Sequence, residues 1–198
     1  MSFISFYQKS LTFFFLGLTV ALPPSVVKAE EKIKLFVSDI IVQADSSLHV
    51  TETITVRAEG QKIKRGIYRD FPTKYEIEGN DFSIGFKLLS VKRDGKNETY
   101  HTEDLRNGIR IYLGRSDYFL PTGDYTYQIT YETTRQLTHL DDMDELYWNV
   151  TGNGWDFTID KVIGNVYLPE NAQVLQSKGY TGYQGDVGDD YQSSPLER

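Results

Sequence analysis

The chain has 198 residues, no cysteine and a formal net charge of −7, and its 39% apolar and 25% charged residues are typical of one folded domain with or without a tail. The acidic balance argues against nucleic acid as a partner, because phosphate binding needs a basic face. The absence of cysteine excludes disulfides, cysteine-ligated zinc, iron–sulfur clusters and a cysteine nucleophile.

Residues 1–29 have the parts of a secretory signal peptide. Lys9 is the only charge before residue 28, and an apolar run from Leu11 to Leu22 follows it. Val27 and Ala29 place small residues at the −3 and −1 positions, so we expect cleavage after Ala29. An uncleaved membrane anchor is the alternative, but a spanning helix needs about 20 apolar residues and this run is shorter. The sequence therefore predicts an exported protein that lies on the periplasmic or cell-surface side of the cytoplasmic membrane.

Residues 30–178 alternate apolar and polar side chains with the period of two that is typical of half-buried strands. The predicted apolar faces are Leu48, Val50, Ile54 and Val56; Ile109, Ile111 and Leu113; Tyr125, Tyr127, Ile129 and Tyr131; and Val162, Val166 and Leu168. A change of phase between Leu88 and Leu89 predicts a β-bulge. We expect an all-β domain, an immunoglobulin-like antiparallel β-sandwich. A closed barrel is the alternative, and strand patterning does not separate the two.

Residues 179–198 are rich in glycine, aspartate and serine, which predicts a loop or tail after the sandwich.

The sequence contains no assembled catalytic or metal-binding motif, so we predict no catalytic residue, no cofactor and no metal ligand. The three histidines lie too far apart to give a metal-ligand spacing: His49, His101 and His139. The acidic run Asp141–Glu145 lacks the calcium-loop pattern, and a solvated loop before a strand at 146–150 is the simpler interpretation. A carboxylate pair, Glu145 and Asp156, is the remaining hydrolase hypothesis.

Two segments supply candidate interaction residues. In the first, Arg65, Tyr68 and Arg69 belong to a basic cluster; arginines clamp carboxylates or phosphates, although pairing with Asp70 or the acids at 141–145 is the simpler interpretation.

In the second, Tyr147, Trp148 and Trp155 lie in a glycine-rich segment and could stack on a sugar ring or anchor a partner. We favour the alternative, in which the tryptophans plug one end of the sandwich and at least one indole N–H is bonded to the backbone.

Three ordered motifs carry a family resemblance: RGIYRDFP at 65–72, GDYTYQITY at 123–131 and DELYWNVTGNGW at 144–155. Over about residues 33–185 the chain resembles the N-terminal domain of a bacterial family of predicted membrane proteins, domain of unknown function 2207. The resemblance implies an extracytoplasmic β-sandwich, preceded by a signal peptide and followed by transmembrane helices. It brings no catalytic residues, because the family has no established activity.

The chain departs from that family at two points. No segment after Ala29 is apolar enough to span a bilayer, so tethering through C-terminal helices would need residues absent from this chain. Relatives often carry cysteine near residues 179–182, and here no disulfide can close that loop. We expect a non-enzymatic interaction or structural domain whose partner is an envelope protein or polymer. Polymer binding through Tyr147, Trp148 and Trp155 is the alternative, and hydrolysis by a carboxylate pair comes third.

Overall fold

The computed structural model describes residues 29–77, 79–182 and 185–195, so the predicted signal peptide up to residue 28 lies outside them. All regular structure in these ranges is strand, which confirms the all-β prediction. Within the same ranges no helix is long and apolar enough to cross a membrane. The strands are β1 (Lys32–Val42), β2 (Leu48–Ala58), β3 (Gly66–Pro72), β4 (Lys74–Ile77), β5 (Asn80–Ser83), β6 (Gly85–Arg93), β7 (Lys96–Asn97), β8 (Tyr100–Leu105), β9 (Gly108–Gly114), β10 (Gly123–Thr134), β11 (Leu137–His139), β12 (Asp144–Leu146) and β13 (Val162–Tyr167).

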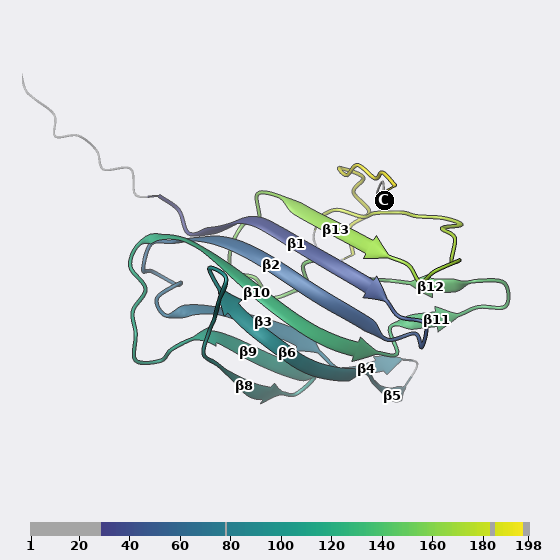
Figure 1. Ribbon diagram of the computed structural model, residues 1–198, viewed down its shortest axis with the longest axis horizontal. Helices are drawn as coiled ribbons and strands as arrows, with labels where there is room; N and C mark the ends of the chain where they lie inside the picture. Colours follow the sequence, from purple (N-terminus) through teal and green to yellow (C-terminus); the bar gives the residue numbers. More distant parts are fainter. Residues whose placement is uncertain (1–28, 78, 183–184, 196–198) are drawn as a thin grey trace, which may run out of the picture.

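The strands form a six-stranded sheet, a three-stranded sheet and two separate hairpins (Figure 1). The larger sheet has the order β13-β1-β2-β10-β6-β7, and the smaller has the order β3-β9-β8. All pairs are antiparallel except β1 and β13, where Phe36 lies opposite Val162 in a parallel ladder. The expectation of a purely antiparallel domain is therefore wrong at this edge. Strands β2 to β12 lie between β1 and β13 in the sequence, so the pair has the long connection that parallel pairing needs.

The two sheets share one hydrophobic core, to which both contribute alternating residues. The predicted faces of β2 and β10 are confirmed, with Tyr125 only partly buried at the start of β10. Ile67 and Phe71 of β3 and the inward residues of β9 supply the opposite side. Phe71 meets the Tyr131 ring at 4.9 Å between centroids, edge to face, which joins the two layers directly.

The predicted β-bulge is confirmed on β6. Thr130 pairs with Ser90 and Tyr131 pairs with Leu88, so Leu89 is the extra residue of that ladder. The bulge keeps Val91 buried although it lies an odd number of residues after Leu88.

Two strand expectations need correction. Val162 and Val166 lie on the same side as Phe36 and Ile40 but are 45% exposed. The second sheet has only three strands, and the loop after β12, with Val150 next to Gly164, covers this edge only in part. The strand expected at residues 146–150 ends at Leu146, and a loop follows it.

Glu31 fixes the start of β1. Its carboxylate accepts backbone N–H groups of the segment after β2, from Glu59 at 2.9 Å, Gln61 at 3.0 Å and Lys62 at 2.6 Å, and also from Ile63. Burial alone would raise the pKa of Glu31, but these N–H donors outweigh it and lower the pKa below its ordinary value.

Candidate functional site

Strand β3 divides the first motif between two faces of the smaller sheet. Ile67, Arg69 and Phe71 point into the core, whereas Tyr68 and Asp70 lie on the outer side. One short strand therefore carries both a buried charge and a polar outer surface.

The buried charge is paired across the core. Arg69 Nε donates to Glu52 Oε2 and Nη2 donates to Oε1, each at 2.8 Å, and the Tyr131 hydroxyl donates to the same Oε1 at 2.9 Å. Burial would lower the pKa of Arg69, but the attraction of Glu52 outweighs it and raises that pKa. Because Glu52 belongs to β2 and Arg69 to β3, the pair ties the two sheets together.

The expectation that Arg69 pairs within the protein is confirmed, but its carboxylate partner was missed. The carboxylate that pairs with Arg69 belongs to Glu52, not to Asp70 or the acidic run at 141–145. Asp70 accepts a hydrogen bond from Arg69 Nη1 through its backbone carbonyl, at 2.6 Å. The available signal was a glutamate in the apolar register of β2, between Val50 and Ile54.

The loop that contains the third motif closes over this ion pair. Gly152 has φ +65°, and a Cβ at this position would lie 2.2 Å from Arg69 Nη1. The Gly152 N–H donates to Asn149 Oδ1 at 3.0 Å and to the Asn149 carbonyl at 3.2 Å, which closes a four-residue turn. The first and third motifs are thus one structural unit, in which glycine is required for close approach.

The two tryptophans of this loop are partly buried against the core. Trp155 meets Phe36 edge-on at 6.1 Å and donates its indole N–H to the Thr151 carbonyl at 2.9 Å, as predicted. Trp148 lies 6.5 Å from Phe71, and its buried Nε1 has no hydrogen-bond partner among the described residues. Tyr147 is 76% exposed.

The outer side of the smaller sheet carries two rows of side chains that the sequence analysis did not connect. We call them the outer aromatic face; its members are Tyr68, Tyr112 and His101 in one row, and Asp70, Arg110 and Glu103 in the next. Arg110 forms a two-pronged pair with Asp70, with Nε to Oδ1 at 2.6 Å and Nη2 to Oδ2 at 2.7 Å. The hydrogen bond to Asp70 raises the pKa of Arg110.

Rings on the outer aromatic face stack on one another. His101 lies parallel to Tyr112 at 4.5 Å, and the Arg110 guanidinium lies 4.1 Å above the Tyr68 ring. The Asp156 carboxylate lies close to the Tyr68 hydroxyl; burial first, and then this carboxylate, raise the pKa of Tyr68. Because neighbours occupy ring faces, the surface offers ring edges, hydroxyls and charges to a partner.

Arg65, the remaining candidate interaction residue, does not belong to the outer aromatic face. It is exposed at the end of the smaller sheet, and its guanidinium stacks 4.0 Å above the Phe119 ring. Of the six candidates, the structure brings Arg69, Trp148 and Trp155 together around the closed loop and places Tyr68 on the outer aromatic face. Tyr147 points to solvent at the start of the loop, and Arg65 lies apart from it.

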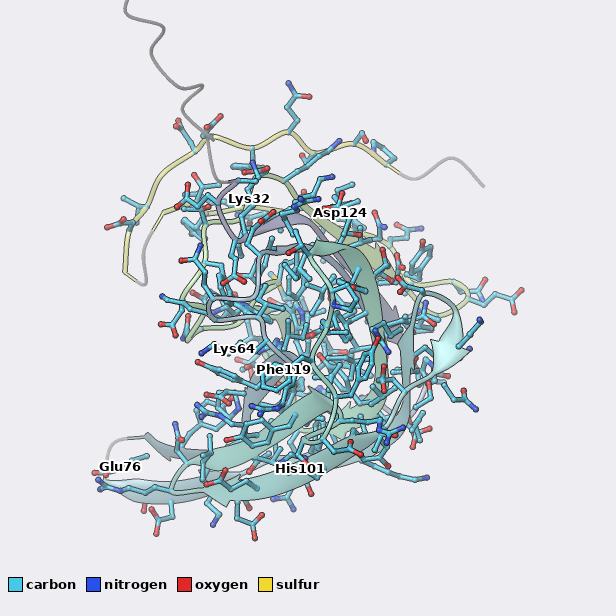
Figure 2. All side chains as sticks on the ribbon, turned by 90° about the vertical axis from the view of Figure 1, so that its left-hand side faces the viewer. Lys32, Lys64, Glu76, His101, Phe119 and Asp124 are labelled. Atoms are coloured by element: carbon cyan, nitrogen blue, oxygen red, sulfur yellow. The ribbon has the colours of Figure 1, made fainter. Side chains whose placement is uncertain are left out.

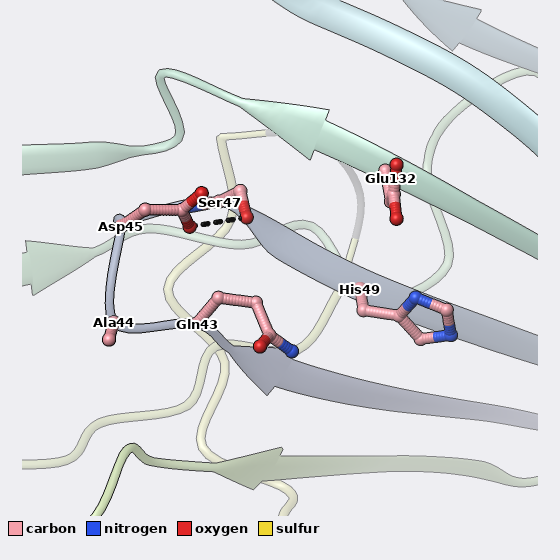
Figure 3. Close-up of a pocket in the computed structure, with 6 residues that line it drawn as sticks. All are labelled: Gln43, Ala44, Asp45, Ser47, His49 and Glu132. Carbon is pink, nitrogen blue, oxygen red and sulfur yellow. Dashed lines mark hydrogen bonds between the residues drawn. The ribbon is translucent and has the colours of Figure 1, made fainter.

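The surface has two hollows large enough for a small molecule. The first, about 530 Å³, lies at the β1–β2 turn, where Asp45 is bonded to Ser47 and His49 lies beside Glu132 (Figure 3). The second, about 350 Å³, is lined by both sheets near β4 and includes Lys74 and Asp104. No group of three His, Asp or Glu side chains in the described ranges could hold a metal ion.

The proposed carboxylate pair, Glu145 and Asp156, lines neither of these two hollows. Glu145 lies on the β11–β12 hairpin, opposite Thr138, whereas Asp156 lies beside Tyr68. The structure therefore gives the hydrolase hypothesis no geometric support.

Comparison with known proteins identifies the family. Residues 32–194 match the family described as the N-terminal domain of a predicted membrane protein, DUF2207, and the chain belongs to that family. It is 36% identical over 161 residues to the uncharacterized protein YciQ of Escherichia coli (strain K12), covering 80% of this chain and 26% of that protein. The chain thus spans about a quarter of the length of this curated relative.

Likeness to solved structures is weaker. Native yeast LTA4 hydrolase matches with a TM-score of 0.40 and 14% identity, over 54% of this chain and 15% of that one. An M1 zinc metallopeptidase from Deinococcus radiodurans matches with a TM-score of 0.36 and 13% identity, over 55% and 21% of the two chains.

Proposed function

Starting from that family, we propose that the domain is a non-enzymatic, extracytoplasmic interaction module with an immunoglobulin-like β-sandwich fold. The observation that carries the proposal is the outer aromatic face, where tyrosine, histidine and arginine side chains gather on the smaller sheet. Tyrosine and arginine are the residue types that dominate the binding energy of protein interfaces.

A protein partner fits this surface better than a sugar polymer does. Stacking on a sugar requires a free ring face, and His101 and Arg110 occupy faces of Tyr112 and Tyr68. The Tyr112 hydroxyl already donates to Glu103 Oε2 at 2.9 Å, and the remaining lone pairs of both groups can accept directional hydrogen bonds from another protein.

Polymer binding through the third motif receives less support. Trp148 and Trp155 pack against the core, which leaves Tyr147 as the single ring of that trio that is freely exposed. Their packing supports a plug that stabilises the loop.

Export is part of the same proposal, with cleavage after Ala29 and attachment to the membrane through helices outside this chain. N-terminal sequencing of the exported protein should return Glu30 as the first residue. A protein that retains its first 29 residues would contradict cleavage and favour an anchor.

The partner can be tested by crosslinking in the native host. A photoreactive phenylalanine analogue at position 101 or 112 should give a discrete adduct that excess purified domain suppresses. The same analogue at Gln128, on the larger sheet, serves as the control. Absence of an adduct, or equal adducts from the control position, would count against the outer aromatic face as the binding surface.

A further inference from the structure

The end of the molecule where β1 begins carries a second surface, which is chemically unlike the rest of the chain. We call it the basic loop patch; its members are Lys62, Lys64, Arg65, Tyr118 and Phe119. They belong to two loops, 59–65 and 115–122, which together hold four basic and two acidic residues in a protein of net charge −7. Figure 2 looks onto this end and shows Lys64 and Phe119 near its middle.

The cations of the patch are available to a ligand. Both acidic residues of the two loops are already paired, Glu59 with Arg57 at 2.6 Å and Asp117 with Arg115 at 2.7 Å. Lys64 and Arg65 form no ion pair with any described residue. Lys62 donates to the Asp156 backbone carbonyl at 3.4 Å and lies 5.8 Å above the Phe157 ring, but it meets no carboxylate among the described residues. The patch therefore presents three cations that no carboxylate in the described ranges neutralises.

Aromatic side chains stand beside these cations. Phe119 is 60% exposed and Tyr118 is 46% exposed. The Arg65 guanidinium lies 4.0 Å above the Phe119 ring, an arrangement that leaves its N–H groups directed outward in the guanidinium plane. Exposed aromatic rings next to lysine and arginine are the composition of protein segments that sit at a membrane–water interface.

The patch is held in shape before any ligand binds. The Leu120 N–H donates to the Lys64 carbonyl at 2.9 Å, which joins the two loops, and the Leu120 side chain is buried in the core. The Tyr125 hydroxyl donates to the Pro121 carbonyl at 2.8 Å and fixes the end of the second loop. A preformed surface loses little conformational entropy on docking.

The start of the domain lies at the same place. Glu31 accepts hydrogen bonds from the backbone of residues 59–63, so Ala29 and Glu30 adjoin the first loop of the patch. The predicted leader joins the domain here, so this end of the domain is the one next to the membrane during export, until cleavage after Ala29.

We propose that the basic loop patch docks the domain onto an anionic phospholipid surface. Lys62, Lys64 and Arg65 attract the headgroup phosphates, and Phe119 and Tyr118 enter the interfacial layer. This inference concerns a different surface from the outer aromatic face and does not depend on the proposed protein partner.

Vesicle binding tests the proposal, with the purified chain from Glu30 to Arg198, which contains every described strand. The chain should co-sediment with vesicles of phosphatidylcholine and phosphatidylglycerol, and not with phosphatidylcholine alone. Lys64→Glu with Arg65→Glu should reduce the partition coefficient by about tenfold or more. Because the attraction is electrostatic and exposed, 0.5 M salt should weaken binding of the parent chain too.

A matched control separates the patch from net charge. Lys74→Glu with Lys178→Glu changes the total charge equally but lies outside the two loops, and it should bind like the parent. If the double variant Lys64→Glu with Arg65→Glu does not fold, Lys64→Gln with Arg65→Gln provides the same comparison without charge reversal. Equal loss of binding in the control, or no binding of the parent to anionic vesicles, would overturn the proposal.

Two further measurements distinguish a surface from a single phosphate site. Phe119→Trp should show a blue-shifted emission with anionic vesicles and none with neutral ones; an unchanged spectrum on bound vesicles would exclude insertion. Soluble glycerol phosphate at millimolar concentration should not displace the chain, and displacement would mean that the patch binds a free phosphate ligand instead.

Discussion

Removing either partner of the buried Arg69–Glu52 pair should strongly destabilise the fold. Arg69 is 4% exposed and Glu52 is fully buried, and two hydrogen bonds of 2.8 Å join them. Arg69→Met leaves the Glu52 carboxylate buried without its counter-charge, which costs about 3–5 kcal/mol in comparable cases. Domains of this size are stable by only about 5–15 kcal/mol, so the variant should lose a large part of its stability.

Removing both charges should cost less than the sum of the single changes. In Glu52→Leu with Arg69→Met no charge remains buried, although the Tyr131 hydroxyl and the Asp70 carbonyl lose partners at about 1–3 kcal/mol each. The double-mutant cycle should therefore report a coupling energy of about 2 kcal/mol or more.

Guanidinium chloride unfolding of the chain from Glu30, followed by circular dichroism, measures these differences. Tyr131→Phe removes one hydrogen bond to the carboxylate and should cost about 1.5–3 kcal/mol, so it is the variant to use if the others do not fold. Additive single changes, or a loss below about 1 kcal/mol for Arg69→Met, would refute the assignment of a strongly coupled buried pair.

Three other changes test separate features of the fold by the same unfolding assay. Gly152→Ala should destabilise the fold by more than Gly60→Ala does. Both glycines have positive φ, but a Cβ at Gly152 would lie 2.2 Å from Arg69 Nη1, whereas a Cβ at Gly60 would meet nothing. Equal losses of stability in the two variants would contradict the close approach at Gly152. Tyr127→Phe should be neutral or stabilising, since the buried Tyr127 hydroxyl has no partner among the described residues, whereas Tyr127→Ala should cost about 3–5 kcal/mol. Glu31 has a lowered pKa in the folded state, so its contribution to folding stability is complete above the ordinary pKa of 4.5 and is lost as the pH falls through the lowered pKa. Glu31→Gln should therefore reduce the free energy of unfolding at pH 7 and make it depend less on pH in the acidic range. An unchanged pH dependence would argue against the hydrogen bonds from the backbone of residues 59–63.

Local alternation predicted much of the fold. The buried faces of β2 and β10 and the bulge at Leu89 followed from period-two patterning, because each depends on residues close in sequence. The parallel pairing of β13 with β1 did not, since strand register across more than a hundred residues leaves no local signal.

The candidate site was predictable only in part. The motifs that carry the family resemblance do meet, at Arg69 and Gly152, but the partner Glu52 was hidden in the apolar register of β2. The outer aromatic face was missed because its rows draw on three strands. Tyr68, His101 and Tyr112 become neighbours only through the pairing of β3, β9 and β8.

The first motif (65–72) and the third motif (144–155) lie side by side, so stability and partner binding must be tested with different residues. β3 is an edge strand, and the loop after residue 147 lies along it, with Gly152 next to Arg69 and Gly154 next to Asp70. Covering an edge in this way prevents pairing with other chains. A change at Tyr68 or Asp70 therefore disturbs both the loop and the outer aromatic face. His101 and Glu103 lie on β8, at the opposite edge of the sheet and away from the ion pair. Substitutions there should alter binding while leaving the unfolding transition unchanged, and they provide the cleaner test of recognition.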